Sequence, residues 1–357
     1  MANTFSQAFP KDLTPKVFLN KVLSGTAVGI VVGLIPNAIL GELFKFLITK
    51  NDIFTTPLVI VQAIQFTVPI IVGVLIALQF GLTAMEAIIT GSAAFAASGA
   101  YKVIDGKFVL VGIGDLINTM LTAAICIIII YLVHDKLGSM TILLLPIIAA
   151  GGAGLIGVLT LPFVSQFTAA IGTGVNSFTD LQPVIMSILI SISFGIIIIS
   201  PVSTVAIATA IGLDGLASGA ANLGICACAM LLVVSSRKVN KSGVTWAVGL
   251  GAMKMMMPNF IKHPIIAIPI VIASTLTGIT GSLLNIQGTA ASAGFGFSGL
   301  VGPINAMKFM TGSPTMNLII AGLAFFVIPL ISALIADFLC TKVFKLYQPE
   351  VFTFNKN

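Results

Sequence analysis

The sequence predicts an all-α polytopic membrane protein with about ten transmembrane helices, and its composition carries most of that prediction. Of the 357 residues, 57% are hydrophobic and only 8% are charged, and the mean hydropathy is +1.14. A soluble domain has about 25% charged residues, so this chain has too few polar side chains to cover a surface that faces water. About 20 apolar residues cross the hydrocarbon core as a helix, and the apolar residues here suffice for about eight to ten spans. This composition excludes a soluble enzyme, a nucleic-acid-binding domain and a disordered tail.

Ten apolar runs are expected to form one integral-membrane domain over residues 1–357, where the two halves of a broken span count as two runs. In chain order they are Val17–Leu40, Pro57–Phe80, Phe108–Val133, Thr141–Leu161, Pro183–Ser200, Val202–Leu213, Leu216–Val234, Val244–Met257, Pro264–Asn285 and Asn317–Cys340. The first run has Gly25, Gly29 and Gly33 at four-residue spacing, a pattern that lets a second helix approach closely. The sixth and seventh runs are halves separated by Asp214-Gly215.

Local signals set the limits of several runs. Pro36 kinks the outer end of the first run, and Asp115 lies near the start of the third. Glycines interrupt the fourth run, and residues 163–182 after it are polar enough to lie at the surface or along the membrane interface. Thus the runs differ in length and regularity, and not every one is expected to be a simple span.

Positive charges gather at the ends of the apolar runs. The clusters are Lys11, Lys16 and Lys21; Arg237, Lys238 and Lys241; and Lys342, Lys345 and Lys356. Short cytoplasmic loops hold the excess of Lys and Arg in membrane proteins. Residues 1–16 are therefore expected to be a cytoplasmic amphipathic N-terminus and residues 342–357 a cytoplasmic tail. The net charge of +6 is explained by topology and indicates no nucleic-acid partner.

Two segments rich in Gly, Ser and Ala do not read as simple spans. Residues 84–100 and 288–315 contain the similar stretches TGSAAFAASGA and GTAASAGFGFSG, one in each half of the chain. Paired, Gly-interrupted apolar segments indicate the solute site of a transporter, and irregular backbone within a membrane must line a cavity or be buried in protein. Both segments are candidate re-entrant segments. The alternative is that the small residues only permit tight helix packing.

Ionisable residues within apolar runs are costly and commonly functional. The candidates are Glu86, Asp115, Asp214, Lys254, His263 and Lys308. Glu86 precedes the first Gly-rich stretch and Lys308 follows the second, so the two are expected to present charges to one cavity if the halves meet. The alternative for the acids is a position at helix ends near the headgroups. Asp337 is expected to pair with Lys342 or Lys345.

Neutral polar side chains among exposed backbone dipoles suit a hydroxyl-rich solute. The predicted substrate-binding residues are Glu86, Thr90, Ser92, Ser98, His263, Gln287, Thr289, Ser292, Ser298, Asn305 and Lys308. No catalytic residue, cofactor or metal site is predicted. The four cysteines lie in apolar runs, and Cys226-x-Cys228 lacks the spacing of zinc ligands. Sequences typical of ATP-driven transport or intramembrane hydrolysis are absent from the chain.

Two stretches, FLNKVLSGTAVGIVVGLIPNAILGELFK (Phe18–Lys45) and SAGFGFSGLVGPI (Ser292–Ile304), resemble the membrane-embedded EIIC components of the bacterial phosphotransferase system. The likeness extends over essentially the whole chain and is greatest to a stand-alone EIIC-like group that includes the perfringolysin regulator. It implies a homodimeric permease for a sugar or other small polar solute in the bacterial cytoplasmic membrane, with about ten spans and re-entrant hairpins.

In phosphorylating relatives, the resemblance implies separate EIIB and EIIA proteins that supply a phosphoryl group to the bound sugar. The chain would then be at most the membrane subunit of a phosphoenolpyruvate-dependent sugar phosphotransferase system. Such relatives often carry a sugar-binding Glu in a Gly-Ile-Thr-Glu-Pro or Asn-Glu-Pro setting. Here Gly278–Thr280 is followed by Gly281, and Lys262-His263-Pro264 replaces the second pattern, so the carboxylate is missing from both.

Two functions therefore stay open at the level of sequence. The first is an EIIC-like permease, with or without phosphorylation of its solute. The alternative is a membrane-embedded sensor or regulator that retains the EIIC fold and signals to a partner, although Ser235–Gly243 and the termini offer little surface for docking. A channel lacks support because no ring of charges typical of a pore is evident.

Overall fold

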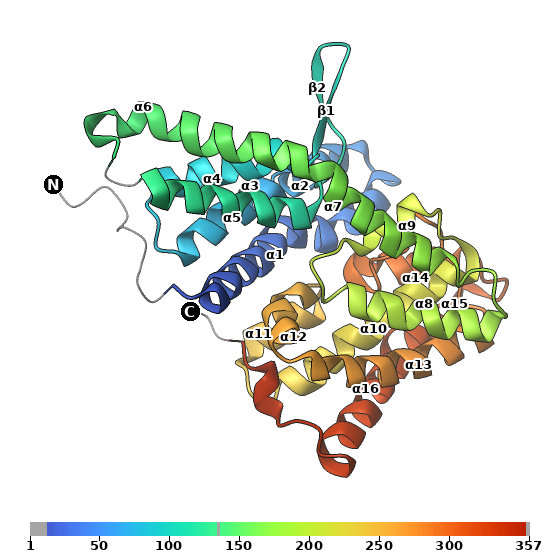
Figure 1. The fold of residues 1–357 in the computed structure, drawn as a ribbon. Coiled ribbons are helices and arrows are strands. Elements are labelled where there is room, and N and C mark those ends of the chain that lie inside the picture. The colour runs from blue at the N-terminus through green and yellow to red at the C-terminus, as the bar shows by residue number, and fades with distance from the viewer. Residues whose placement is uncertain (1–12, 134–135, 355–357) are drawn as a thin grey trace. The chain divides into compact units, whose positions relative to one another are not determined.

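The structure is a computed structural model that describes residues 13–133 and 136–354. Helices dominate it (Figure 1). The chain divides into two compact units: a first unit of residues 1–37 and 55–166, and a second unit of residues 38–54 and 167–356. Most of the predicted amphipathic N-terminus, residues 1–16, lies outside the described residues.

The first unit is a group of helices that carries one β-hairpin. Its elements are the first part of α1 (Pro15–Ile48), α2 (Thr55–Phe66), α3 (Val68–Gln79), α4 (Ala84–Ala97), β1 (Tyr101–Ile104), β2 (Lys107–Leu110), α5 (Leu116–Val133), α6 (Thr141–Leu145) and the first part of α7 (Gly152–Asn176). The predicted glycine pattern of the first run packs against α3, because a Cβ on Gly25 would lie 2.4 Å from the Cα of Ile76. Close helix approach at this pattern is therefore confirmed.

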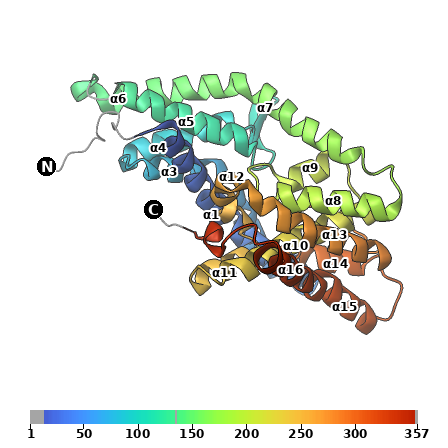
Figure 2. The same cartoon turned by 60° about the horizontal axis from the view of Figure 1, so that its bottom comes forward.

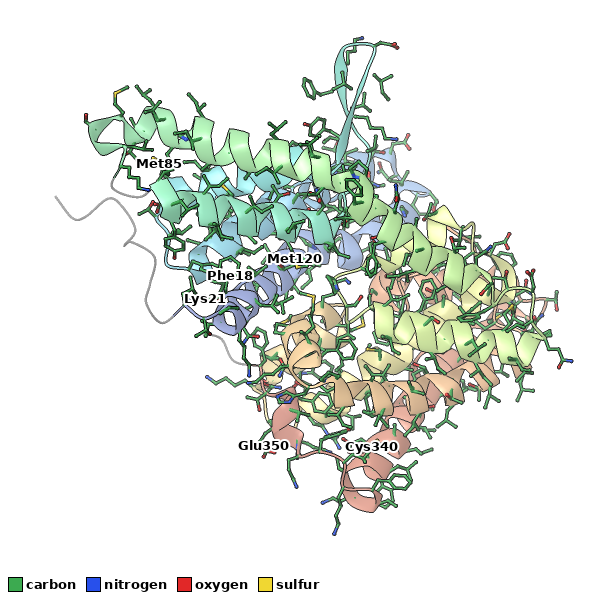
Figure 3. All side chains as sticks on the ribbon, in the orientation of Figure 1. Phe18, Lys21, Met85, Met120, Cys340 and Glu350 are labelled. Atoms are coloured by element: carbon green, nitrogen blue, oxygen red, sulfur yellow. The ribbon has the colours of Figure 1, made fainter. Side chains whose placement is uncertain are left out.

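The end of α3 is held by α1. The Nζ of Lys21 donates to the backbone oxygen of Gln79 at 2.6 Å and lies 5.5 Å from the ring centroid of Phe80. Phe18 packs on the same ring, with 4.8 Å between centroids (Figure 3). A lysine at this position satisfies one of the carbonyl groups that a helix C-terminus leaves without a partner within the helix.

The β-hairpin was not predicted, and it corrects the start of the third apolar run. Asp105 and Gly106 both have positive φ, 49° and 73°, as a type I′ turn requires, and Tyr101 pairs with Leu110 across the two strands. Figure 1 shows the hairpin projecting from the helices of its unit. The predicted span from Phe108 is wrong in its first residues, because α5 begins only at Leu116.

The second unit is built around α10. Its other elements include the end of α1, η1 (Asp52–Phe54), the end of α7, α8 (Pro183–Ile197), α9 (Thr204–Ala210), α11 (Ser242–Gly249), η4 (Met253–Met256), α12 (Met257–Lys262), α13 (Ala267–Leu283), α14 (Val301–Met307), α15 (Pro314–Gly322) and α16 (Ile328–Phe338). The central helix α10 (Gly215–Ser236) packs against α8, α13 and α16 (Figures 1 and 2). Small residues allow the close contact: a Cβ on Gly224 would lie 1.9 Å from the backbone oxygen of Ser191 on α8.

Six helical stretches in the described part of the chain are long and apolar enough to cross a membrane, or seven if a bent pair forms one span. They are Pro15–Asn37, Leu116–Val133, Gly138–Asn176, Gly215–Ser236, Pro264–Leu283 and Pro314–Val343, and the bent pair is Asp52–Phe66 with Val68–Gln79. The predicted all-α polytopic class agrees with these helices, whereas the count of about ten spans is not confirmed.

Two predicted boundaries are wrong. The run Val244–Met257 is not one helix, because α11 ends at Gly249 and Gly251 has a φ of 133° before the chain resumes as η4. The fourth run does not end at Leu161, because α7 continues through Pro162 to Asn176. A proline costs a helix one internal hydrogen bond, and packing elsewhere along a long apolar helix can outweigh that loss.

Candidate functional site

The second Gly-rich segment forms a loop, residues 284–300, that is held against α9 and α10 of its own unit. The backbone N–H of Gly288 donates to Gly215 at 2.9 Å, and the Ser218 hydroxyl donates to the backbone oxygen of Thr289 at 2.9 Å. The Thr204 hydroxyl donates to the backbone oxygen of Gly294 at 2.8 Å. Side chains of the neighbouring helices thus supply the hydrogen bonds that a helix would have formed internally.

Asn222 is the main anchor of the loop. It is buried on α10, and its Oδ1 accepts from the backbone N–H groups of Gly296 at 2.9 Å and Phe295 at 3.3 Å. The asparagine thus provides an acceptor for two backbone N–H groups of a segment that is neither helix nor strand. The loop is therefore packed into the core of the second unit and held there by hydrogen bonds.

Glycine is required in the loop for two reasons. Gly294 and Gly296 have φ values of 95° and 61°, which L side chains rarely adopt. There is also no space for a side chain, because a Cβ on Gly294 would lie 2.7 Å from the backbone nitrogen of Val205. From the other side, a Cβ on Gly219 of α10 would lie 1.8 Å from the backbone oxygen of Ile286. The small residues of this segment bring the backbone of the loop against α9 and α10.

Three of the predicted substrate-binding residues come together here as the Thr289 cluster, which consists of Thr289, Ser292 and Asn305. The Ser292 Oγ lies 2.9 Å from both the backbone nitrogen and the backbone oxygen of Thr289. The Thr289 hydroxyl lies 3.4 Å from the Oδ1 of Asn305, whose Nδ2 donates to Val301 at 3.1 Å. Ser292 is buried, whereas Thr289 and Asn305 are half-buried.

The other predicted residues of the second unit lie apart from this hydrogen-bonded cluster. Gln287 is half-buried and donates to the Oδ1 of Asn285 at 3.2 Å. Ser298 is buried, Lys308 is exposed at the end of α14, and His263 follows the end of α12. Among the described residues, no side-chain hydrogen bond joins Ser298, Lys308 or His263 to the Thr289 cluster.

The predicted residues of the first segment make local helix contacts. Glu86 forms a capping box with Thr83: its Oε2 accepts from the Thr83 backbone N–H at 2.8 Å, and the Thr83 hydroxyl accepts from the Glu86 backbone N–H. Thr90 and Ser92 donate to carbonyls four residues earlier, and the Ser98 hydroxyl donates to Phe95 at 2.8 Å. The helix α4 continues through Gly91 without a break. Glu86, Thr90, Ser92 and Ser98 belong to the first unit, so a cavity shared with Lys308 of the second unit stays a prediction.

A buried lysine lies where three irregular segments of the second unit meet. The Nζ of Lys254 donates to the backbone oxygens of Ser200 at 2.5 Å and Val202 at 2.8 Å, in the break between α8 and α9. The neighbouring Gly251 abuts the Gly-rich loop, since a Cβ there would lie 2.9 Å from the Oγ of Ser298. We call this meeting of residues 198–203, 250–256 and 284–300 the three-break junction.

Lys254 is 6% exposed and lies outside the six apolar helices. Burial lowers the pKa of its ammonium group from the usual value to about 7, and Cys228 on α10 acts on this pKa in the opposite direction. Desolvation has this sign for a lysine because it disfavours the charged form. The sequence marked Lys254 as a cation within an apolar run, but only the fold places it at the three-break junction.

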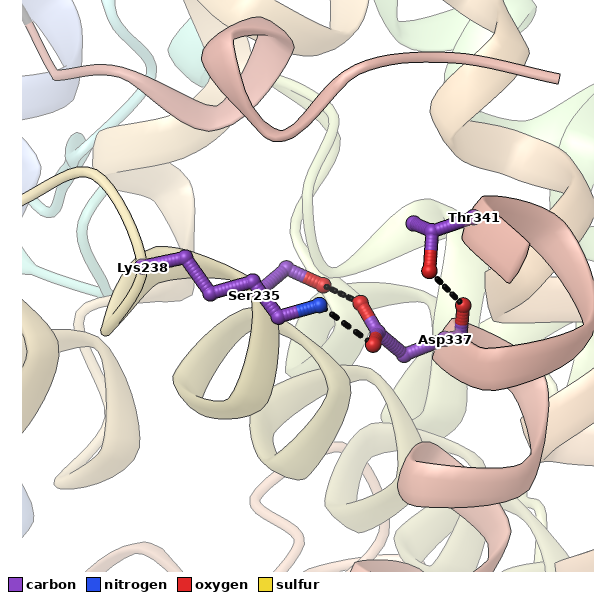
Figure 4. A network of polar contacts seen from close by, with 4 residues as sticks. All are labelled: Ser235, Lys238, Asp337 and Thr341. Carbon is purple, nitrogen blue, oxygen red and sulfur yellow. Dashed lines mark hydrogen bonds and ion pairs between the residues drawn. The ribbon is translucent and has the colours of Figure 1, made fainter. Parts of the chain in front are cut away.

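Asp337 forms the ion pair that the structure shows at the end of α16, and the partner differs from the prediction. The Nζ of Lys238, in the loop after α10, lies 2.5 Å from the Oδ2 of Asp337, and the Ser235 hydroxyl donates to its Oδ1 at 3.2 Å (Figure 4). The predicted partners Lys342 and Lys345 are wrong. Thr341 instead donates to the backbone oxygen of Asp337 at 2.7 Å.

The predicted tail, residues 342–357, is packed on the second unit as far as it is described. Asn240 donates to the backbone oxygen of Phe352 at 2.7 Å and accepts from the N–H of Phe354 at 2.7 Å. Asn259 donates to the backbone oxygens of Val351 and Thr353 at 2.9 and 2.8 Å. The segment is therefore a strap fixed by two asparagine side chains, and its cytoplasmic location stays a prediction.

The described residues contain no group of three or more His, Cys, Asp or Glu side chains that could hold a metal ion. The four cysteines are buried free thiols. In the described part of the chain, the chemistry offered by the Gly-rich loop and the three-break junction is that of hydroxyls, amides, backbone carbonyls and one ammonium group.

The family comparison agrees with this architecture of apolar helices around an irregular, glycine-rich loop. The family model described as Phosphotransferase system, EIIC matches residues 20–354, nearly the whole chain. Neither the curated proteins nor the solved structures include a significant match. The family that the sequence resembles is thereby confirmed, and with it the multi-pass membrane class. This chain belongs to the EIIC family of the phosphotransferase system.

Proposed function

We propose that the protein is a permease for a small, hydroxyl-bearing solute such as a sugar, and that the solute binds at the Gly-rich loop of the second unit. Membership of the EIIC family makes the chain a membrane transport component. The single observation that carries the finer proposal is the loop 284–300, whose backbone is held by Ser218, Asn222 and Thr204. Irregular backbone within a membrane is tolerated where it is buried in protein or lines a cavity, and paired, glycine-interrupted segments of this kind mark the solute site of many transporters.

The Thr289 cluster is suited to exchange hydrogen bonds with such a solute. The distance of 3.4 Å between the Thr289 hydroxyl and the Asn305 Oδ1 is long for an O–H···O bond, which is commonly about 2.7–2.8 Å. A solute hydroxyl that forms a shorter hydrogen bond to Thr289 or Asn305 therefore replaces a weak bond, and little free energy is lost when that bond breaks. Thr289 and Asn305 are also half-buried, so they are not sealed within the core.

The missing carboxylate favours transport without phosphorylation through that site. At the position where the resemblance leads one to expect a sugar-binding Glu, Gly281 packs within α13 and a Cβ there would lie 2.3 Å from the Leu223 side chain. The preceding Gly278 is equally close-packed, with a Cβ position 2.7 Å from the backbone oxygen of Ser187. This part of α13 is a packing surface. A homodimer and a bacterial cytoplasmic membrane with both termini inside are further parts of the proposal, and separate EIIB and EIIA proteins would be needed only if the solute is phosphorylated.

The test is a thermal-shift screen of the detergent-purified full chain with sugars, polyols, sugar acids and nucleosides. A ligand at a hundredfold excess over its Kd stabilises the folded state by about 2.7 kcal/mol. We expect a hit that is lost in Thr289→Val and kept in Thr173→Val, because Thr173 is exposed on α7 and bonds only within its own helix. A hit that survives Thr289→Val would place the solute elsewhere.

The alternative, a membrane-embedded sensor or regulator, is favoured by the same missing carboxylate. It predicts binding without movement of the solute. Uptake by proteoliposomes of the solute identified in the screen, measured with and without phosphoenolpyruvate and soluble EIIB and EIIA proteins, separates the two functions. Uptake supports the permease, and binding with no uptake under either condition supports the regulator.

A further inference from the structure

We propose that Lys254 binds a carboxylate group of the solute, and that the solute class is therefore a hydroxyl-bearing carboxylic acid such as a sugar acid. This inference rests on the proposed function and specifies its substrate. It comes from the three-break junction, where the buried ammonium group of Lys254 bonds to two carbonyls of residues 198–203 and the nearby Gly251 abuts Ser298 of the Gly-rich loop.

The first step is the charge of Lys254. The side chain is 6% exposed, and its hydrogen-bond partners are two neutral carbonyl oxygens, those of Ser200 and Val202. Among the described side chains, no carboxylate lies within ion-pair distance of its Nζ. A buried charge without a counter-ion is costly, and burial accordingly lowers the pKa of Lys254 to about 7. An anion bound beside Lys254 would stabilise its charged form.

The second step is the hydrogen-bonding capacity of the ammonium group. An ammonium group has three N–H donors in total, and the two carbonyls of the α8–α9 break take two of them. The third can form a charge-assisted bond to a carboxylate oxygen, which is about twice as strong as a neutral bond. The two carbonyl bonds hold the Nζ in place, so little side-chain freedom is lost when the anion binds.

The third step is the neighbourhood of the ammonium group. Gly251, three residues before Lys254, abuts Ser298 of the Gly-rich loop, and the Thr204 hydroxyl beyond the α8–α9 break donates to Gly294 of the same loop. The cation and the proposed hydroxyl-binding loop therefore belong to one junction. A solute with a carboxylate at one end and hydroxyl groups along its chain matches both features.

The number of charges favours a carboxylate over a phosphate. One ammonium group neutralises one negative charge, whereas a phosphate dianion would leave a second charge buried without a partner. A neutral sugar would offer the ammonium group of Lys254 no counter-ion. Specificity then follows because a neutral sugar would leave the ammonium group without a counter-ion, and a phosphate would bring a second negative charge without a partner.

The test uses matched neutral and anionic ligands on the purified full chain. Glucose and gluconate, galactose and galactonate, and acetate as a carboxylate without hydroxyl groups are titrated at constant ionic strength, with thermal shift and calorimetry as readouts. We expect at least one sugar acid to bind at least tenfold more tightly than its neutral partner, and acetate to bind weakly. Lys254→Gln should remove the preference and Lys254→Arg should retain part of it. Lys262→Gln, an exposed lysine on α12, should behave as the unaltered protein.

Each outcome separates this inference from the proposed function. Binding of a neutral sugar as tightly as its acid, or a preference for the acid that persists in Lys254→Gln, overturns the role of Lys254 and leaves the solute site of the permease standing. Binding of none of these ligands contradicts this inference, whereas a hit among the polyols or nucleosides of the thermal-shift screen would still support the proposed function. If Lys254→Gln does not fold, Lys254→Arg carries the test: a preference for the acid weaker than in the unaltered protein supports the role of Lys254, and an unchanged preference overturns it.

Discussion

Replacing Asn222 by alanine should release the Gly-rich loop from α10 while leaving the helices of the second unit in place. The Oδ1 of Asn222 accepts from the N–H groups of Gly296 at 2.9 Å and Phe295 at 3.3 Å. A buried donor left without a partner costs about 1–3 kcal/mol. The bond at 3.3 Å is longer than usual and counts for less, so we expect the loop to lose about 2–4 kcal/mol of local stability.

Amide hydrogen exchange measures this loss directly, because exchange reports the free energy of local opening. Since about 1.4 kcal/mol corresponds to a factor of ten, the amides of residues 294–297 should exchange roughly 30 to 1,000 times faster in Asn222→Ala. The amides of α13 (Ala267–Leu283) should keep their rates, as should all amides in the control Asn176→Ala, whose side chain is exposed at the end of α7. A change of less than threefold at residues 294–297 would refute the assignment of Asn222 as the anchor of the loop.

Three further predictions concern charge, backbone conformation and pH. The ion pair of Lys238 with Asp337 is partly exposed, with side-chain exposures of 30% and 11%. A double-mutant cycle of Lys238→Met and Asp337→Asn should therefore give a coupling free energy of about 1 kcal/mol in thermal unfolding. Additive effects of the two substitutions would show that the pair contributes nothing to stability. Gly294→Ala should lower the melting temperature more than Gly81→Ala. Both glycines have positive φ, which costs a side chain about 1–2 kcal/mol, but nothing lies within 4 Å of a Cβ at Gly81, and equal losses would exclude the clash with α9. Burial lowers the pKa of Lys254 to about 7, so between about pH 7 and pH 10 the unfolded chain binds more protons than the folded chain. The free energy of unfolding should therefore rise with pH across that window. Lys254→Gln should flatten the rise, and an unchanged slope in that variant would assign the rise to another group.

Several features that the structure adds were already encoded locally. The stretch YKVI-DG-KFVL has an Asp-Gly pair between two short apolar segments, which is a strong hairpin signal. It was obscured because the second strand runs on toward the long apolar run of α5. In the same way, Thr83 and Glu86 have the spacing of a capping box, and this local role explains a carboxylate that the sequence marked as a candidate for solute binding.

Other assignments needed contacts between distant segments. Asp337 pairs with Lys238, 99 residues earlier, although Lys342 and Lys345 are far closer along the chain. The helix α16 ends at Phe338, and Lys342 follows in the π-helical turn η8 (Leu339–Val343) with its side chain exposed. Lys238 is the partner of Asp337 because α16 packs beside α10, and no local sequence pattern predicts that packing.

By itself, the sequence determined that this protein is an α-helical multi-pass membrane protein, because the ratio of apolar to charged residues leaves no surface fit for water. The family came from the resemblance and from the match of the EIIC family model to residues 20–354. The sequence also predicted that residues 288–315 are irregular; residues up to 300 form a loop, whereas Val301–Met307 form α14. Only the tertiary structure decided where the hydrogen bonds of that loop go, and that Lys254 meets the α8–α9 break beside it. The physical reason is that buried backbone groups and a buried charge must find partners, and those partners lie on α9, on α10 and in the α8–α9 break, 52 to 90 residues away along the chain.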